Sequence, residues 1–377
     1  MKKLGFGFVR LPELVESNGK RKVDLEQVKK MVDLCMEHGF TYFDTAYMYH
    51  EFKSELYLKE ALVKRYPREQ FQVANKLPLL FLRKEGDMEE IFDEQLRKCN
   101  VTFFDYYLLH NVNETFLQTA EKFDCFGFLK RMKEQGKIHQ IGFSFHDSAE
   151  LLEEILIKHP EVDFVQLQIN YVDWDNMSIQ SKACFDVANK YNKPIIAMES
   201  LKSGSLAHVP DMIQNIFEQV HPEWSPASWA IRFAASQPGV MLVLSGMSSM
   251  DHLMDNIDFM DEFEPMGDKE EMVIDLATVI LREIREIPCT GCGECVASCA
   301  KNIPIPYYFA LYNSEKVSSD AAVTTNSIYY GNYSQKGGKA SECLGCKKCE
   351  KSCPNHLTIA EFMKQVAMTF ETPGERY

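Results

Sequence analysis

Two short runs of cysteine constrain this 377-residue chain more than any other feature. Both runs have the spacing C-x2-C-x2-C-x3-C; the first is Cys289, Cys292, Cys295 and Cys299, and the second is Cys343, Cys346, Cys349 and Cys353. Three such closely spaced thiolates wrap one corner of a cubane, and the fourth is turned toward a second cluster. We therefore expect two [4Fe–4S] clusters, one held by Cys289, Cys292, Cys295 and Cys353 and the other by Cys343, Cys346, Cys349 and Cys299.

Zinc ribbons and disulfides are the two other uses of such cysteines. Structural zinc takes four ligands in two pairs rather than two complete sets of four. Disulfides need an oxidising compartment, and the first twelve residues contain no continuous apolar segment typical of a signal peptide. The iron–sulfur reading is therefore favoured. Ala300 stands where the first run would usually carry proline, which removes no ligand.

Length and charge limit the class of protein. A chain of 377 residues accommodates one large and one small domain. No apolar run is long enough to span a membrane, so we expect a soluble, cytoplasmic protein without a membrane partner. The net charge of −14 argues against nucleic-acid binding. The charge is uneven, because the segment from Cys289 to Tyr377 carries a net +1.

Short apolar runs alternate with helical patterns up to about residue 260. The runs are Leu4–Val9, Phe40–Phe43, Phe71–Ala74, Phe103–Leu109, Ile141–Phe145, Phe164–Ile169, Ile195–Met198 and Val240–Leu244. The expected helices include Leu25–Glu37, Met88–Cys99, Ala149–Lys158, Ser181–Tyr191 and Pro226–Ser236. Eight strand–helix units predict an α/β fold, a (β/α)8 TIM barrel over residues 1–265. An open doubly wound sheet is the alternative, although no G-x-G-x-x-G follows the first run.

Polar residues stand where the expected strands end. In such barrels the catalytic groups come from the ends of several strands. The residues are Asp44 and Tyr49 after the second run, Lys76 after the third, His110 after the fourth, Ser144 at the end of the fifth, Gln166 on the sixth, Glu199 and Ser200 after the seventh, and Ser245 and Gly246 after the eighth. Taken singly each could be a cap or a core hydrogen-bonding residue, but four on consecutive strands predict an active site.

Over about residues 1 to 260 the sequence resembles the aldo-keto reductase family. The resemblance rests on Phe43-Asp44-Thr45-Ala46-x-x-Tyr49, Ala74-Asn75-Lys76, His110, Leu4-Gly5-Phe6-Gly7, Ile141-Gly142-Phe143-Ser144 and Val165-Gln166. Asp44, Tyr49, Lys76 and His110 match the family's catalytic tetrad in order and approximate separation. Together with the cysteine runs, this resembles the subgroup that carries a C-terminal ferredoxin-type domain with two [4Fe–4S] clusters.

The chemistry of the tetrad follows from its side chains. Reducing a carbonyl needs a hydride and a proton, and a free tyrosine, with a pKa of about 10, is a poor acid. We expect Tyr49 to be the general acid, Lys76 to lower the pKa of its phenol, and Asp44 to hold Lys76. His110 would orient the carbonyl oxygen. In the reverse direction, alcohol oxidation, Tyr49 would be the base.

The resemblance also implies a dinucleotide site. It places a nicotinamide carboxamide on Ser144 and Gln166, with Met198, Glu199 and Ser200 nearby. The start of the last barrel helix, Ser245, Gly246, Met247, Ser248 and Ser249, suits a phosphate, and Asp255 and Asn256 would meet the adenine. The chain departs from the family pattern in three places: Phe145 replaces an asparagine, Met198 replaces a tyrosine, and no Lys or Arg occurs between Ser245 and Asn256. NAD(P)H is therefore expected without a clear preference for NADPH, and FMN is an alternative.

Residues 266–377 form the second expected domain, small, α-rich and ferredoxin-like. Glu270–Glu286 predicts a linking helix that leads into Cys289. The cysteine runs are separated by 43 residues, which is more than a compact ferredoxin needs. Within them Tyr329–Gly338 is expected to be a mobile loop. The segment between the runs either packs over the barrel or forms a lid on the active site.

Electron counting leaves three functions open. A nicotinamide moves two electrons and a cluster moves one, so a flavin is one way to connect them. In the first reading, the barrel interconverts a small carbonyl and an alcohol, and the clusters relay electrons to or from an external carrier. In the second, the protein is an ordinary NAD(P)H-dependent carbonyl reductase with structural or sensory clusters. In the third, it is an electron-transfer module with an idle barrel, which the complete tetrad disfavours.

A basic segment near the second cysteine run predicts the charge of the carrier. Its residues are Lys336, Lys339, Lys347, Lys348 and Lys351. Either they offset the negative charge of a cluster, or they attract an acidic one-electron carrier such as a ferredoxin or a flavodoxin.

Overall fold

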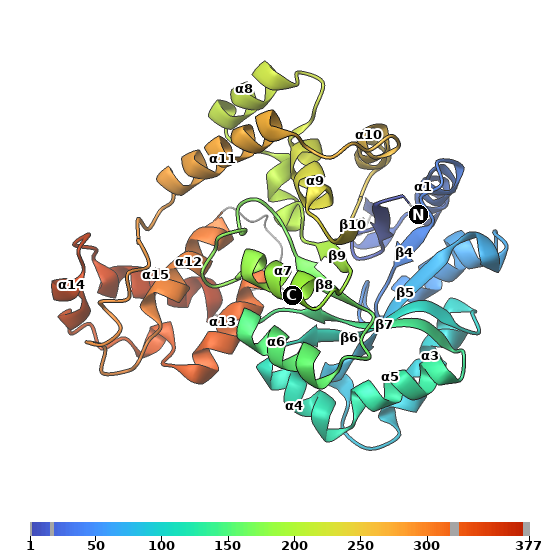
Figure 1. Ribbon diagram of the computed structural model, residues 1–377, viewed down its shortest axis with the longest axis horizontal. Helices are drawn as coiled ribbons and strands as arrows, with labels where there is room; N and C mark the ends of the chain where they lie inside the picture. Colours follow the sequence, from blue (N-terminus) through green and yellow to red (C-terminus); the bar gives the residue numbers. More distant parts are fainter. Residues whose placement is uncertain (1, 16–18, 317–323, 372–377) are drawn as a thin grey trace.

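The computed structural model describes residues 2–15, 19–316 and 324–371. Within these residues, eight parallel strands close into a barrel in the order β1-β10-β9-β8-β7-β6-β5-β4, and β4 pairs back with β1 (Figure 1). The strands are β1 (Leu4–Gly7), β4 (Tyr42–Asp44), β5 (Gln72–Pro78), β6 (Phe104–Val112), β7 (Ile138–Phe145), β8 (Phe164–Gln168), β9 (Ile195–Met198) and β10 (Val240–Ser245). Each expected run overlaps one of these strands, so the barrel is confirmed and the open sheet is wrong.

Helices surround the barrel in chain order. They are α1 (Leu25–Glu37), α2 (Ser54–Leu58), α3 (Asp87–Cys99), α4 (Glu114–Lys122), α5 (Cys125–Glu134), α6 (Ala149–Lys158), α7 (Ser181–Lys190), α8 (Asp211–Val220), α9 (Pro226–Ser236), α10 (Met250–Met260) and α11 (Asp268–Glu283). Short turns are η1 (Lys59–Val63), η2 (Arg68–Gln70), η3 (Leu79–Phe81) and η4 (Lys202–Ala207). None of the helices in the described residues is both long and apolar enough to cross a bilayer.

Capping residues in the sequence mark where two of these helices begin. The Asp24 carboxylate accepts a hydrogen bond from the Gln27 amide at 3.0 Å before α1. Ser225 accepts one from the Ser228 amide at 3.0 Å, and Pro226 occupies the first turn of α9. One barrel feature was not predicted, a short antiparallel hairpin of β2 (Glu13–Val15) and β3 (Arg21–Val23) between β1 and α1.

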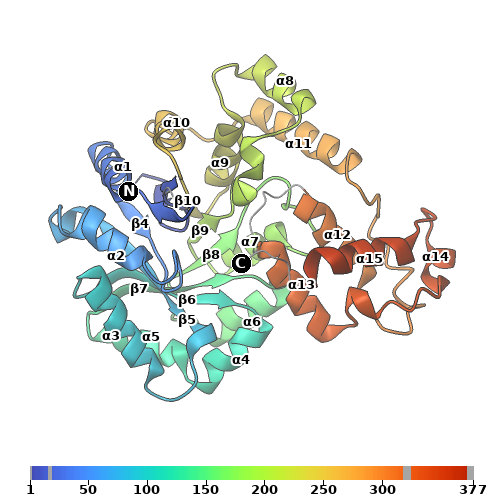
Figure 2. The same cartoon turned by 180° about the vertical axis from the view of Figure 1, so that it is seen from behind.

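The C-terminal helices form a second core beside the barrel. They are α12 (Ile305–Lys316), α13 (Thr325–Lys336), η5 (Ala340–Glu342), α14 (Lys348–Ser352) and α15 (Ile359–Phe370). Figures 1 and 2 show α12 and α13 between the barrel and the peripheral α14. This core contains Ile287 and residues of α12, α13 and α15, whereas the buried side chains of α11 belong to the barrel core. The helix α11 therefore packs with the barrel, although it follows the expected division at residue 265.

The segment Tyr329–Gly338 is mostly helix, not the mobile loop expected from its composition. Tyr, Gly, Ser and Asn are poor helix formers, so its local sequence does not favour a helix. Tertiary packing supplies the stability instead: the Tyr330 ring stacks on Phe370 at 4.9 Å and lies 4.6 Å from the Tyr308 ring, centroid to centroid. If the segment between the cysteine runs covers the active site as a lid, the covering element is therefore an ordered helix, α13.

Candidate active site and iron–sulfur sites

The four tetrad residues meet at one end of the barrel. Asp44 ends β4, Lys76 lies in β5 and His110 lies in β6, so neighbouring parallel strands deliver them to the same end. The Lys76 Nζ is 2.5 Å from Asp44 Oδ1 and 2.9 Å from the Thr45 carbonyl oxygen. It also donates to the Tyr49 hydroxyl at 3.4 Å. The Tyr49 and His110 rings lie edge to face, 6.0 Å apart.

Burial sets the protonation of this group. Burial raises the pKa of the Tyr49 hydroxyl, and the Lys76 ammonium offsets only part of that rise. Lys76 thus lowers the pKa of Tyr49 as expected, but burial raises it by more, so the net shift is upward. Burial lowers the pKa of the Lys76 ammonium, but Asp44 and the Tyr49 hydroxyl together outweigh burial and raise that pKa above its ordinary value. Burial, and secondarily Lys76 and His146, hold the pKa of His110 well below its ordinary value. At neutral pH Tyr49 thus keeps its proton and His110 is neutral.

A cavity of about 230 Å³ opens at the tetrad. It brings together many of the residues predicted from strand ends: Asp44, Tyr49, His110, Ser144, Gln166, Met198, Glu199, Ser200, Ser245 and Gly246. Lys76 lies behind this surface and is 1% exposed. The other predicted cofactor residues, Met247, Ser248, Ser249, Asp255 and Asn256, are not among those that line the cavity.

The residues beyond the cavity are bonded within the barrel. Asn256 accepts a hydrogen bond from the Ser245 hydroxyl at 2.7 Å. Asp255 accepts one from Ser225 at 2.8 Å. Ser249 caps α10 by accepting from the His252 amide at 3.2 Å. These contacts hold the β10–α10 loop and the start of α10 in place.

Two features of the cavity fit a nicotinamide dinucleotide. The Gln166 Nε2 is buried and faces the Asp44 carboxylate without a hydrogen bond of normal geometry, and a carboxamide would supply an acceptor. Gly246 lines the cavity with backbone alone, and a Cβ there would come 3.2 Å from Val9 Cγ1, so a larger residue would crowd the segment after β1. The donor set therefore fits a carboxamide on β8 and a phosphate near the β10 loop.

Among the cavity-lining residues that sequence reasoning missed, four bear on the chemistry or on the link between the domains: Arg10, His146, Thr325 and Ile328. Arg10 follows β1, and its Cβ lies 3.8 Å from a Cβ built on Gly246, so it brings a cation beside the β10 loop. His146 follows Ser144 by two residues at the end of β7. Thr325 and Ile328 come from α13, so the segment between the cysteine runs contributes to the active-site wall. The alternation Ser144, Phe145, His146 was the one sequence signal for His146.

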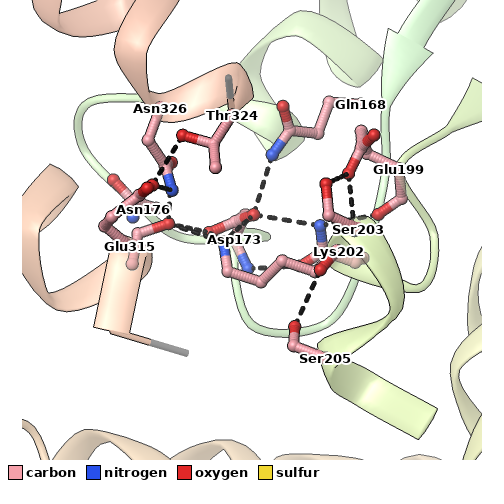
Figure 3. Close-up of polar contacts among 12 residues, drawn as sticks. Gln168, Asp173, Asn176, Glu199, Lys202, Ser203, Ser205, Glu315, Thr324 and Asn326 are labelled. Atoms are coloured by element: carbon pink, nitrogen blue, oxygen red, sulfur yellow. Dashed lines mark hydrogen bonds and ion pairs between the residues drawn. The ribbon is translucent and has the colours of Figure 1, made fainter. Parts of the chain in front are cut away.

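The loop after β9 forms one wall of the cavity and has a strained backbone. Glu199, Lys202 and Ser203 all adopt positive φ, at 55°, 48° and 58°. Such left-handed conformations cost free energy for residues other than glycine and persist where the surroundings hold them. The Glu199 carboxylate accepts hydrogen bonds from the Ser203 amide and hydroxyl at 2.7 and 3.0 Å (Figure 3).

A buried ion pair ties this loop to the C-terminal helices. Lys202 Nζ lies 2.7 Å from Asp173 Oδ2, and the two side chains are 3% and 0% exposed. Lys202 also contacts the Ser314 hydroxyl of α12 at 2.5 Å, and Ser314 donates to Asp173 at 3.2 Å. Figure 3 shows Asn326, from α13, on the other side of Asp173 from Gln168. The active-site loop is thus anchored on both domains.

The cysteines surround two separate cavities. Cys289, Cys292, Cys295 and Cys353 line the first, and Cys299, Cys343, Cys346 and Cys349 line the second. Each cavity therefore combines three cysteines of one run with the last cysteine of the other run. This grouping supports the crossed ligation. No three His, Cys, Asp or Glu side chains of the described residues are close enough to bind a single metal ion, and four thiolates around a cavity fit a larger cubane.

Crossed ligation makes a specific prediction for Cys353. Replacing Cys353→Ala should release the cluster of the first cavity, so the bound iron falls from about eight to about four per chain. Anaerobic alkylation followed by mass spectrometry should then modify Cys289, Cys292 and Cys295 and leave the second set protected. Cys184→Ala, a buried barrel cysteine, is the control that should protect all eight. Modification of Cys343, Cys346 and Cys349 instead would show that each run binds its own cluster.

Comparison with known proteins agrees with this arrangement. A family model described as the aldo/keto reductase family matches residues 3–274, and a 4Fe-4S dicluster domain matches residues 288–358. A probable aldo-keto reductase 1 from Glycine max is 30% identical over 150 residues, which cover 38% of this chain and 41% of the relative. The chain thus spans about two fifths of that relative's length.

Solved structures share the barrel fold. An aldo-keto reductase from Bacillus halodurans in its holo form has a TM-score of 0.57 at 19% identity, covering 73% of this chain and 91% of that chain. An aldo/keto reductase from Klebsiella pneumoniae, in complex with NADP and acetate, has a TM-score of 0.57 at 18% identity and the same coverages, 73% and 91%. These structures do not cover the remaining part of this chain, and the 4Fe-4S dicluster domain match lies at residues 288–358.

Proposed function

Because the chain belongs to the aldo/keto reductase family, we propose that its barrel interconverts a small carbonyl compound and an alcohol. One observation carries the proposal: Asp44, Tyr49 and His110 share one cavity, with Lys76 bonded to both Asp44 and Tyr49 behind it. A buried hydroxyl near a neutral imidazole, at the barrel end where such enzymes react, supports this reaction.

Each tetrad residue has a distinct part in the reaction. Hydride addition to the carbonyl carbon leaves negative charge on the oxygen, and the Tyr49 hydroxyl donates a proton to that oxygen to give the alcohol. The Lys76 ammonium stabilises the tyrosinate that remains, and Asp44 holds Lys76 in place. The neutral His110 donates a hydrogen bond that orients the carbonyl oxygen.

A nicotinamide dinucleotide is the proposed source of hydride. Ser144 and Gln166 would hold its carboxamide, and Ser245, Gly246 and Arg10 would lie near a phosphate. When bound, it supplies hydride to the carbonyl or accepts hydride from the alcohol. The solved relative from Klebsiella pneumoniae contains NADP. We expect no strong preference for NADPH over NADH here, because Arg10 is a single cation and the β10–α10 segment adds no Lys or Arg. FMN at the same phosphate site is the second candidate.

Deuterium transfer tests the carbonyl chemistry. The protein is incubated with a panel of small aldehydes and ketones and with NADH or NADPH deuterated at C4 of the nicotinamide. We expect one deuterium on the carbinol carbon of the alcohol, measured by mass spectrometry. No labelled alcohol from any member of the panel, with protein shown to bind the dinucleotide, would contradict the proposal.

We propose further that the two clusters relay electrons between the barrel and an external carrier. Converting a carbonyl to an alcohol takes two electrons and two protons, and two [4Fe–4S] clusters exchange one electron each. The number of clusters thus equals the number of electrons per turnover. A bound flavin remains one candidate for coupling single electrons to hydride. The reducing conditions that such clusters need fit a cytoplasmic location.

Exposed lysines near the second cluster site are the proposed docking surface for the carrier. Lys347, Lys348 and Lys351 are exposed, and no ion pair with them is found among the described residues. Leu344, 66% exposed, adds an apolar contact beside them. Lys336 does not belong to this surface, because it pairs with Glu114 at 2.6 Å on the barrel. An acidic ferredoxin or flavodoxin has the charge that this surface would attract.

Charge reversal tests this docking surface. Lys347→Glu with Lys348→Glu should slow cluster reduction by a reduced acidic carrier about tenfold at low salt, because steering by opposite charge is lost. The difference should shrink at high salt, since the Debye length is about 8 Å at 0.15 M and shorter above it. The control, Lys122→Glu with Lys130→Glu, makes the same charge change on exposed residues of α4 and α5. Equal slowing by both pairs would show a net-charge effect and no local docking.

A second function is supported by one specific observation. Thr325 and Ile328 of the segment between the cysteine runs line the active-site cavity. In this second function the protein is an ordinary NAD(P)H-dependent carbonyl reductase. Its clusters hold this segment in place and have a structural or sensory role. This function predicts carbonyl reduction that never changes the oxidation state of the clusters.

A further inference from the structure

A second cavity, of about 340 Å³, lies between the barrel and the second domain and is separate from the tetrad. The walls of this interdomain cavity come from the loop after β8 (residues 172–177), the last turns of α11 with Arg285 beyond them, and the second domain from Cys289 into α12. Figure 1 shows α11 running from the barrel toward this domain. The cavity has the volume of a small-molecule site, about 300–1,000 Å³, and no residue of the proposed reaction lines it.

Arginine gives the interdomain cavity a positive charge. Its charged lining residues are Asp175, Arg282 and Arg285, one negative and two positive, which gives a net +1 in a chain whose net charge is −14. The Arg282 guanidinium donates to the Asp175 carboxylate at 3.0 Å, and these side chains are 47% and 57% exposed. Exposed ion pairs of this kind are weak, because water solvates and screens both partners. Arg282 is therefore available to a ligand.

Arg285 is the cation without a partner. No ion pair of Arg285 is found in the part of the chain that the structure describes, and its buried Nε has no hydrogen-bond partner there. A guanidinium N–H that is shielded from water without an acceptor costs free energy. The chain beside it is already fixed, since Asn313 of α12 bonds both the amide and the carbonyl of Ile287, at 2.9 and 2.8 Å. The backbone between Arg285 and Cys289 is thus positioned before any ligand arrives.

The interdomain cavity adjoins the first cluster site. Cys289 and Thr290 line both cavities. Gly291, the next residue, has a φ of 76°, and a Cβ there would come 3.0 Å from the Met177 Sδ of the loop after β8. Glycine therefore allows the cysteine run to approach the barrel this closely. A ligand in the interdomain cavity would contact the chain at a residue that binds the first cluster.

We propose that the interdomain cavity binds a small phosphate ester, with its phosphate group between Arg285 and Arg282. A guanidinium matches phosphate oxygens with paired N–H groups, and two guanidinium groups balance the charge of a phosphate dianion. A monocarboxylate would balance only one of them. The cavity is larger than a phosphate, and the apolar side chains of Val172, Leu281 and Pro306 on its walls would contact the organic part of the ester.

A phosphate in this position also acts on the first cluster. Reduction makes the cluster more negative, and a bound phosphate beside Cys289 opposes that change. The ester should therefore bind more tightly to the oxidised protein, and by reciprocity its binding lowers the reduction potential of the first cluster. Electron flow through the first cluster then depends on the concentration of the ester. This effect does not require the carbonyl chemistry of the barrel.

Binding is tested by anaerobic calorimetry on the oxidised protein with both clusters in place. Two pairs of compounds differ only by the phosphate, ribose 5-phosphate with ribose and FMN with riboflavin. In at least one pair the ester should bind tenfold or more tightly than its partner, and at least tenfold more tightly than inorganic phosphate. Arg285→Gln should abolish this preference, and Arg285→Lys should retain part of it. Arg97→Gln, at an exposed position on α3, makes the same charge change as Arg285→Gln and should retain the full preference.

The reduction potential is the second measurement. An EPR-monitored redox titration with saturating ester should show one of the two clusters shifted downward, by about 59 mV for a tenfold change in a one-electron equilibrium. The ester should cause no such shift in Arg285→Gln. If Arg285 is only a counter-ion of the cluster, neither pair of compounds will show a preference in the wild type, although Arg285→Gln will still lower the potential. That result would overturn the proposal, as would a preference that Arg285→Gln leaves unchanged or equally tight binding of inorganic phosphate.

Discussion

Replacing Tyr49→Phe should lower the turnover of carbonyl reduction by about 10² to 10⁴-fold, the usual contribution of a general acid. The ring and its packing against His110 remain, so the loss reports the missing proton. The reason lies in the site: burial raises the pKa of Tyr49, so the hydroxyl is protonated when hydride adds to the carbonyl carbon. Steady-state kinetics on any accepted carbonyl compound measures the effect.

A neighbouring tyrosine supplies the control for this experiment. The Tyr47 hydroxyl donates to Glu94 on α3 at 3.1 Å and does not line the cavity. Tyr47→Phe should therefore leave turnover within about twofold. If Tyr49→Phe behaves like Tyr47→Phe, then Tyr49 is not the acid, and another group in the cavity must protonate the oxygen.

Removing iron should loosen the helices that cover the active site. Cys299 and Cys343 line the same cavity, so one cluster would join both ends of the 43-residue segment that contains α12 and α13. Opening this link restores chain entropy to the segment, and metal binding of this kind is coupled to local folding. We expect amide hydrogen exchange in α12 and α13 to speed up by tenfold or more after anaerobic chelation, measured by mass spectrometry.

The barrel provides the internal reference for this measurement. Exchange in β5 and β6 should stay unchanged, because their hydrogen bonds do not depend on the second domain. Cys346→Ala should reproduce the effect of the chelator, and Cys125→Ala, a buried barrel cysteine, should not. Unchanged protection of α13 without iron would mean that its bonds to the barrel, such as Asn332 to His146 and Lys336 to Glu114, are sufficient to hold it.

The barrel was predictable because its strands are buried on both faces. Such strands appear as continuous apolar runs, and Ile195–Met198 and Val240–Leu244 are clear examples. The interior is filled by one side chain from each of several strands, including Tyr42, Leu108 and Phe164. Strand ends then predicted Asp44 and His110, because parallel strands bring their carboxyl ends together.

The parts that could not be predicted depend on contacts distant in sequence. Arg10 reaches the β10 loop because barrel closure pairs β1 with β10, whose paired residues are 239 positions apart in the chain. The helix α13 forms from residues of low helix propensity because the barrel and the aromatic rings of the second core hold it. His146 was missed because the matched family motif ends at Ser144, and because the environment of His146 is created by α13.

The central claim is that the clusters relay electrons to the carbonyl chemistry in the barrel. Oxidation of the clusters during carbonyl reduction tests it most directly. Protein with its bound cofactor would be reduced anaerobically until the clusters give the EPR signal of the reduced state, freed of reductant, and mixed with an accepted carbonyl compound. The account predicts that the signal disappears and that one alcohol forms for every two electrons lost, with Tyr49→Phe slowing both. A signal that persists while added NADH or NADPH drives reduction of the same compound would contradict the relay and leave the clusters a structural or sensory role.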